Sequence, residues 1–149
     1  AASLTRALQI VMERGTGRRS MFSRMGVAAK TGTSSDYRDS WFAGFDANLL
    51  SVVWVGRDDN ASHGLSGSRG AMQVWETFAL ETQITPAITP HLSNEIEWTE
   101  VDYRLGMSAH EKCADVVSVP VPRHADLPRL PGCGITLESI RRRMRGLFE

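Results

Sequence analysis

Residues 27–58 read VAAKTGTSSDYRDSWFAGFDANLLSVVWVGRD. This stretch contains three strand-like segments, at 27–33, 40–46 and 49–55, which are joined by short polar links. The link at 46–48 is short enough only for an antiparallel hairpin, and the longer link before it suits a wider hairpin loop. The last segment is almost wholly apolar, which predicts a central strand that is buried on both faces.

Helices are predicted on both sides of these segments. In residues 4–14, apolar side chains recur at i, i+3, i+4 and i+7, with Ser3 as a plausible N-cap and glycines after the last turn. Residues 71–81 carry a second apolar stripe, and a Gly/Ser-rich loop precedes them. These patterns predict an α+β fold in which an antiparallel sheet is covered by helices.

The character of the chain changes after residue 85. All 6 prolines lie beyond that point, so the chain is predicted to divide there, with residues 1–85 as part of a folded domain and residues 86–149 as an irregular, Pro-rich appendage. One strand is expected within the appendage, at about 95–103, and an amphipathic helix at about 137–148.

The charge balance excludes some classes of partner. Lys plus Arg and Asp plus Glu number 17 each, so the total charge points neither to nucleic acid nor to a membrane surface. No apolar run approaches the roughly 20 residues that a membrane-spanning helix needs. No cofactor is expected from any motif in the chain.

Lys30-Thr31-Gly32-Thr33 is the motif with the most chemical meaning. Lys30 supplies a compact positive charge, and Thr31 and Thr33 supply hydroxyl groups, as recognition of a peptide carboxylate requires. Gly32 has no side chain, so a bound peptide backbone can lie against the strand edge, and the Thr33 N–H can donate to a developing oxyanion. A strand that merely ends in small polar residues is the alternative, which the tetrapeptide alone does not exclude.

The order of the segments resembles the end of the transpeptidase domain in class A penicillin-binding proteins, most closely those of the 1B type. The motif strand is followed by Trp-Phe-Ala-Gly at 41–44, by Trp-Val-Gly-Arg-Asp at 54–58 and by a glycine-rich helix start at 67–71. The resemblance is strong over residues 3–85 and weak over 86–149. It implies the C-terminal portion of the DD-peptidase/β-lactamase-like transpeptidase fold.

The resemblance implies a serine-type D-Ala-D-Ala transpeptidase that cross-links peptidoglycan stem peptides and is acylated by β-lactam antibiotics. Lys30 and Thr33 would then be catalytic, and Lys30, Thr31, Gly32 and Thr33 would bind substrate. For the intact family member, the resemblance also implies a glycosyltransferase that polymerises lipid II and a lipoprotein activator as a further partner. It implies a location on the periplasmic side of the bacterial inner membrane, with a membrane anchor outside this chain.

The nucleophile is expected on other polypeptide. The family's Ser-x-x-Lys and Ser-x-Asn motifs do not occur in these 149 residues. By the resemblance they lie upstream, so the upstream part of the same enzyme is the expected partner of this chain. We therefore expect the 149 residues alone to be inactive.

Cys113 and Cys133 have more than one interpretation. A disulfide is favoured, because the resemblance implies an extracytoplasmic protein, and closing a loop of about twenty residues stabilises a fold by ~3 kcal/mol. A zinc site that includes His110 and His124 matches no standard ligand spacing, so no metal is expected. Two free buried thiols stay open as the third interpretation.

Other functions compete with the transpeptidase hypothesis. A serine β-lactamase or D,D-carboxypeptidase shares the fold, although the Pro-rich tail and the segment at 54–58 argue against it. A non-catalytic interaction module, with the tail docking on partner proteins, is the alternative from another class. A phosphate-binding loop needs Gly immediately before the Lys and again five residues earlier, but positions 29 and 24 are Ala and Arg.

Overall fold

The structure is a computed structural model that describes residues 1–86 and 92–132. The chain divides into two compact units at residues 91 and 92, and each unit is described by itself. The helix predicted at about 137–148 and the thiol of Cys133 lie outside the described residues.

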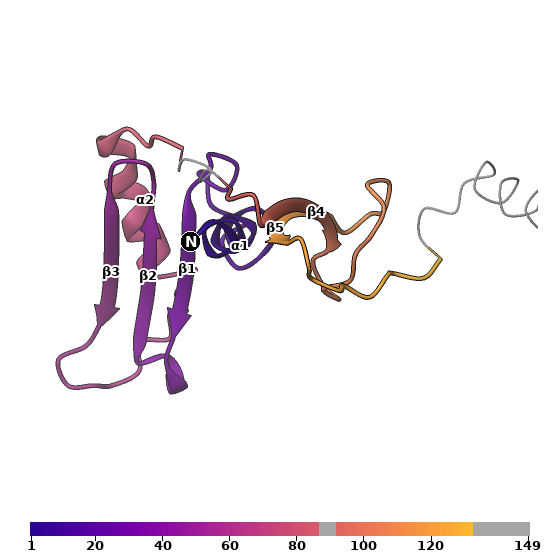
Figure 1. Ribbon diagram of the computed structural model, residues 1–149. Helices are drawn as coiled ribbons and strands as arrows, with labels where there is room; N and C mark the ends of the chain where they lie inside the picture. The colour runs from indigo at the N-terminus through magenta and orange to yellow at the C-terminus, as the bar shows by residue number, and fades with distance from the viewer. Residues whose placement is uncertain (87–91, 133–149) are drawn as a thin grey trace, which may run out of the picture. The chain divides into compact units, whose positions relative to one another are not determined.

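The first unit contains two helices and one antiparallel sheet of three strands (Figure 1). In chain order its elements are α1 (Ala2–Arg14), β1 (Ala28–Thr33), the 3-10 turn η1 (Ser35–Tyr37), β2 (Asp39–Phe45), β3 (Leu50–Gly56) and α2 (Ala71–Thr82). The strands lie in the order β1-β2-β3, because a hairpin joins each strand to the next. The predicted α+β class, with an antiparallel sheet and covering helices, is confirmed.

The core lies between the sheet and α2, around the indole of Trp75. Trp75 is 2% exposed, and its ring lies 5.4 Å from that of Phe22 and 4.7 Å from that of Phe42. Its N–H donates to the Ser51 hydroxyl at 2.7 Å, so the polar end of the indole is satisfied as well. The other members of the buried cluster are Met12, Val27, Ala29, Ala71, Met72 and Ala79. This cluster fixes α2 against the helix-facing side of the sheet.

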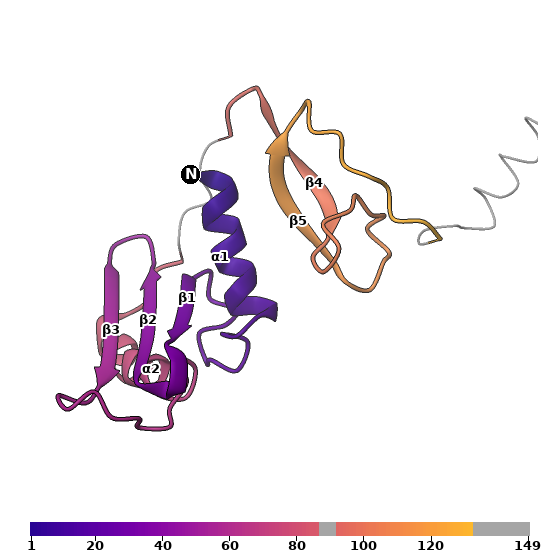
Figure 2. The ribbon, with the colours of Figure 1, turned by 90° about the horizontal axis from the view of Figure 1, so that it is seen from below.

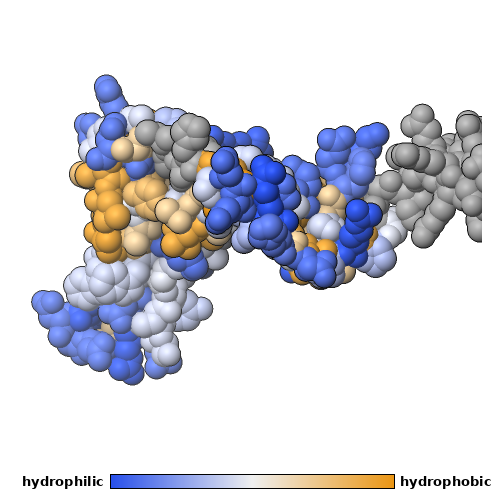
Figure 3. Space-filling view, viewed as in Figure 1, coloured by the Kyte–Doolittle hydropathy of each residue, from blue (hydrophilic) through white to orange (hydrophobic). Residues whose placement is uncertain are grey.

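β3 corrects the expectation of a strand that is buried on both faces. It is an edge strand, and Leu50, Val52 and Trp54 on its outer face are 71%, 55% and 47% exposed. Figure 3 shows apolar side chains gathered over this part of the sheet. The apolar run was misleading because burial depends on which elements cover each face, and within residues 1–86 both helices pack on the opposite side.

The start of α1 also differs from the expectation. The helix begins at Ala2, so Ser3 lies inside it and does not cap it. The N-cap position is Ala1, whose carbonyl accepts the Thr5 N–H at 3.0 Å, and no side chain caps the helix. Alanine has the highest helix propensity, which favours this extension by about one half-turn.

The second unit contains one strand that was predicted and one that was not. β4 (Ile96–Asp102) corresponds to the strand expected at 95–103, whereas its antiparallel partner β5 (Val116–Pro122) was read as irregular because of its prolines. The Arg123 N–H donates to the Glu95 carbonyl at 2.8 Å, so this nitrogen points toward β4. Because successive backbone nitrogens of a strand point in opposite directions, those of Pro120 and Pro122 point away from β4. Prolines at such positions remove no ladder hydrogen bond.

Within the described residues, the structure contains no helix that is both long and apolar enough to cross a bilayer.

Candidate functional site

The Lys-Thr-Gly-Thr motif forms the last four residues of β1, at the free edge of the sheet. β2 pairs with one side of β1, and no strand among residues 1–86 or 92–132 pairs with the other side. Figure 2 shows that α1 runs beside this edge. Lys30 and Thr33 are nevertheless exposed, so the end of the edge that carries the motif is open to solvent.

The backbone of β1 presents hydrogen-bonding groups along the free edge. The Ser34 N–H donates across the sheet to the Asp39 carbonyl at 3.0 Å. Because N–H groups alternate in direction along a strand, those of Lys30 and Gly32 point toward β2, and those of Thr31 and Thr33 point away from it. The Thr33 N–H is therefore a donor aimed at the open side of the motif.

The side chains of the motif are divided between the two faces of the sheet. Lys30 lies opposite Ala43, on the outer face, whereas Thr31 and Thr33 lie on the face that the helices cover. The reason is the two-residue period of a strand. The structure therefore brings the two threonines to one face and Lys30 to the other, with the strand edge between them.

The two threonine hydroxyl groups already have partners within the chain. Thr31 is 8% exposed, and its hydroxyl lies 2.7 Å from the Thr16 hydroxyl. The Thr33 hydroxyl accepts the Gly67 N–H at 2.9 Å and keeps its own proton available for an acceptor. Of the two hydroxyl groups, Thr33 is the one that reaches solvent.

The Lys30 ammonium curls over the strand edge. Its Nζ donates to the Thr31 carbonyl at 2.6 Å, which agrees with an edge-facing Thr31 carbonyl. No carboxylate of the described residues forms an ion pair with Lys30. Its positive charge is therefore not neutralised by the described part of the chain, and an incoming anion can approach it.

A glycine that the sequence reasoning did not single out fixes the motif from behind. A Cβ on Gly67 would lie 2.4 Å from the Gly32 carbonyl oxygen and 2.7 Å from that of Trp41, so the backbone at Gly67 lies directly on β1 and β2. The hydroxyl of Ser40 holds the same loop, because it donates to the Ser66 carbonyl at 3.0 Å and accepts the Ala71 N–H at 2.8 Å. The signals in the sequence were the Gly/Ser-rich loop before α2 and the glycine-rich helix start at 67–71, and neither predicts this backbone contact.

Gly32 has a structural role besides leaving room for a ligand. It lies directly opposite Trp41, and a Cβ on Gly32 would lie 3.1 Å from the Cβ of Trp41. The absence of a side chain at Gly32 therefore avoids a steric clash with Trp41. It also leaves space on the outer face of the sheet beside Lys30.

A carboxylate lies at the end of β2 nearest the motif. The Trp54 indole N–H donates to Asp39 Oδ1 at 2.9 Å, and this bond, together with the hydrogen bond to Ser34, lowers the pKa of Asp39 below its ordinary value. The charges of His63 and Arg38 lower the pKa further. Asp39 therefore carries its negative charge at neutral pH, at the hairpin that follows the motif.

The cysteine prediction is only partly inside the described range. Cys113 is 9% exposed, and Cys133 lies outside the described residues, so the predicted disulfide stays a prediction. Within residues 1–86 and 92–132, no three His, Cys, Asp or Glu side chains gather in a way that would hold a metal ion.

Comparison with known proteins finds penicillin-binding proteins. The chain is 38% identical over 99 residues to penicillin-binding protein 1B of Haemophilus influenzae, a match that covers 64% of this chain and 12% of the relative. It is 42% identical over 76 residues to penicillin-binding protein 1B of Vibrio cholerae, which covers 50% of this chain and 10% of the relative. With penicillin-binding protein 1A of Aquifex aeolicus the identity is 44% over 70 residues, covering 46% and 10%.

A solved structure agrees with these sequence matches. The crystal structure of penicillin-binding protein 1A from Haemophilus influenzae superposes with a TM-score of 0.61 at 25% identity, over 83% of this chain and 20% of that chain. No family model matches the chain. The chain thus spans about a tenth of the length of the curated relatives that it matches.

Proposed function

Because this chain is a relative of the class A penicillin-binding proteins, we propose that residues 30–33 form one wall of the acyl-transfer site of a peptidoglycan D,D-transpeptidase. The observation that carries the proposal is the open end of β1, where an ammonium group with no ion-pair partner among the described residues and an outward-facing backbone N–H lie three residues apart on one strand edge. Peptidoglycan synthesis is the process to which the relatives' names point.

The substrate in this proposal is a stem peptide that ends in acyl-D-Ala-D-Ala. Its backbone adds to the free edge of β1 as an extra strand, so main-chain hydrogen bonds supply affinity. Its terminal carboxylate pairs with the Lys30 ammonium, and the Thr33 hydroxyl supplies a neutral donor. Gly32 leaves the space in which the peptide backbone lies.

The reaction is acyl transfer in two steps. A serine hydroxyl attacks the carbonyl carbon between the two D-Ala residues, the serine proton passes to a base, and the terminal D-Ala leaves with a proton on its nitrogen. The resulting ester is attacked by an amine of a second stem peptide, which forms the cross-link and returns the proton to the serine. The Thr33 N–H donates to the oxyanion in both steps, a contribution worth about 10²–10³ in rate for such donors.

Lys30 has a second role in this scheme. An ammonium group beside the attacking serine stabilises negative charge as the proton leaves, and it helps proton transfer during acylation. β-Lactams follow the first step, because their strained amide takes the place of the scissile D-Ala–D-Ala bond, and the ester then persists.

The attacking serine is not part of this chain in the proposal. Neither Ser-x-x-Lys nor Ser-x-Asn occurs in the 149 residues, so another stretch of polypeptide must supply the nucleophile and its base. We place the assembled enzyme on the periplasmic face of the bacterial inner membrane, where stem peptides and lipid II are its substrates and a lipoprotein activator is a further partner.

A chimera tests the proposal. Residues 1–85 of this chain replace the matching segment of the Haemophilus influenzae penicillin-binding protein 1B, and both the chimera and the 149-residue chain are exposed to a fluorescent penicillin. We expect covalent label on the chimera and none on the chain alone. A folded chimera that takes no label contradicts the proposal, and label on the chain alone contradicts the absent-nucleophile argument.

The same experiment separates the competing functions. A transpeptidase keeps the penicillin as a long-lived ester, whereas a β-lactamase hydrolyses the ester and loses the label within the time of the assay. An interaction module gives no labelling in the chimera at all. Washing out free penicillin and following the bound fluorescence distinguishes the three outcomes.

A further inference from the structure

A hollow of about 680 Å³ lies between the loop after α1 and the start of α2. Three guanidinium groups line it, those of Arg18, Arg19 and Arg69, together with the hydroxyl of Ser68. We propose that this arginine hollow binds a polyvalent phosphate group, such as a pyrophosphate moiety. The proposal does not rest on the transpeptidase function, since no residue of the motif lines the hollow.

The first two arginines stand on a loop whose backbone is held in place. The Arg18 N–H donates to the Gly15 carbonyl at 3.2 Å, and the Ser20 N–H donates to the Gly17 carbonyl at 2.9 Å. Gly17 and Ser20 are buried on either side of the arginine pair. The two side chains therefore leave the surface from a fixed turn, which lowers the entropy lost when they bind a ligand.

The third arginine stands on a second fixed loop. The Arg69 N–H donates to the Ser66 carbonyl at 2.9 Å. The next residue, Gly70, is buried so closely that a Cβ there would lie 2.6 Å from the Ser40 hydroxyl oxygen. Arg69 is thus aimed from the N-terminal end of α2 toward the same hollow as the arginine pair.

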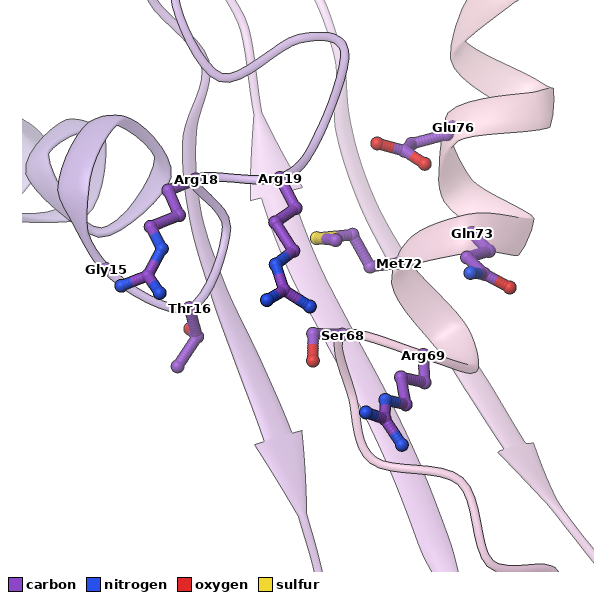
Figure 4. Close-up of a pocket in the computed structure, with 9 residues that line it drawn as sticks. All are labelled: Gly15, Thr16, Arg18, Arg19, Ser68, Arg69, Met72, Gln73 and Glu76. Carbon is purple, nitrogen blue, oxygen red and sulfur yellow. The ribbon is translucent and has the colours of Figure 1, made fainter.

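The charges of the hollow are not balanced within the described chain. Its lining contains three guanidinium groups and one carboxylate, that of Glu76, which leaves a net charge of +2. In Figure 4 the guanidinium groups of Arg19 and Arg69 lie on either side of Ser68, that of Arg18 lies beside Thr16, and Glu76 lies farther along α2. Glu76 also accepts the Met21 N–H at 3.2 Å, which partly occupies it.

The three arginines differ in this respect from the ion-paired arginines of the first unit, Arg6, Arg38 and Arg57. Arg6 and Arg57 form ion pairs with Glu13 and Asp59 at 2.6 and 2.8 Å. Among the described residues, none of the arginines of the hollow forms an ion pair. Gathering like charges costs free energy unless an anion compensates them, so the arrangement favours a negatively charged ligand.

The number and shape of the donors select the class of anion. Each guanidinium group binds two phosphate oxygens at once. The terminal oxygens of a pyrophosphate, which are arranged tetrahedrally around each phosphorus, are numerous enough for three guanidinium groups. A carboxylate has only two oxygens, which one fork can occupy. The first N–H groups of α2 are already bonded to Ser40 and Gly67, so α2 contributes its dipole and not free donors.

Calorimetric titration of the full 149-residue chain with sodium pyrophosphate tests this proposal. Malonate, a dicarboxylate, serves as the comparison ligand at the same ionic strength. We expect pyrophosphate to bind at least about tenfold more tightly than malonate. Equal affinities, or no heat of binding with pyrophosphate, would overturn the proposal.

Matched variants locate the site. Arg19→Gln and Arg69→Gln each remove one fork from an exposed side chain, and each is expected to weaken pyrophosphate binding by about tenfold. Arg57→Gln, an exposed arginine outside the hollow, is the control and is expected to leave the affinity unchanged. If Arg57→Gln weakens binding as much as the other two variants, the binding is nonspecific and the site is refuted. Thermal unfolding of each variant checks that the fold persists.

Discussion

Gly67→Ala is the sharpest structural test of how the motif strand is held. The new Cβ would lie 2.4, 2.7 and 2.9 Å from the Gly32 O, the Trp41 O and the Gly32 N, which are all backbone atoms of the sheet. Overpacking of a well-packed site costs about 1–3 kcal/mol, and backbone atoms cannot rotate away as a side chain does. We therefore expect a loss near the upper end, about 3 kcal/mol, which lowers the folding equilibrium constant by about a hundredfold.

Urea denaturation followed by far-ultraviolet circular dichroism measures this loss. Gly64→Ala is the matched control in the same loop, because no atom lies within 4 Å of its Cβ position and only its φ of +74° opposes the substitution. That backbone conformation costs about 1 kcal/mol for alanine. If the Gly67→Ala variant is no less stable than the Gly64→Ala variant, the contact between this loop and the motif strand is refuted.

Three further predictions concern the packing, the charge and the cysteines of the chain. For Asp46, burial raises the pKa, but hydrogen bonds from four backbone N–H groups, those of Thr85, Asn48, Leu49 and Asp46 itself, lower it below the ordinary 3.8. A carboxyl group whose pKa is lowered in the folded state stabilises the fold above the unfolded pKa, and this stabilisation is lost as the pH falls through the folded pKa. Asp46→Asn should therefore cost about 0.5–1 kcal/mol at pH 7 and nothing at pH values well below 3.8. Urea titrations of the variant and the parent chain at both pH values measure the difference. Trp75→Leu removes the ring that packs against Phe42 and should cost about 3 kcal/mol by the same denaturation assay; a loss below about 1 kcal/mol would mean that α2 is not docked as described. Intact-mass measurement after alkylation without reductant should leave Cys113 and Cys133 unmodified, and alkylation of both thiols would rule out the disulfide.

Much of the first unit could be predicted from the sequence, because local signals and tertiary packing agree there. The hairpin link at 46–48 is too short for any other connection, so it set the antiparallel pairing of β2 and β3 correctly. The apolar stripe of residues 71–81 likewise predicted α2, and Ala71 and Trp75 of the stripe are buried, although Val74 and Phe78 are 52% and 44% exposed. In both cases a periodic pattern and a turn signal pointed to the same structure.

Burial and strand pairing were harder to predict where a local signal is ambiguous. The apolar run that became β3 carries no information on which elements cover each face, so its exposed outer side was not anticipated. β5 was missed because Pro120 and Pro122 argue against a strand unless their nitrogens face away from the partner, and that direction depends on a register that the sequence does not reveal.

In the candidate site, too, local sequence signals were informative and contacts between distant segments were not predicted. The motif identified the strand, and the open edge at Lys30 and Thr33 fits the chemistry expected of it. The inward direction of Thr31 and its contact with Thr16 depend on the face that each residue occupies, and Gly67 acts through a backbone contact with no motif of its own. Such contacts join segments that are distant in sequence, so only the fold reveals them.

The rate of acylation by a fluorescent penicillin tests the central claim most directly. In the chimera that carries residues 1–85, Lys30→Ala is compared with Arg57→Ala, a surface control whose partner is Asp59. Because the Lys30 ammonium is proposed to bind the carboxylate and to assist proton transfer, we predict a fall of about a hundredfold or more for Lys30→Ala and no change for the control. An acylation rate within about twofold of the parent chimera would remove Lys30 from the mechanism and contradict the account.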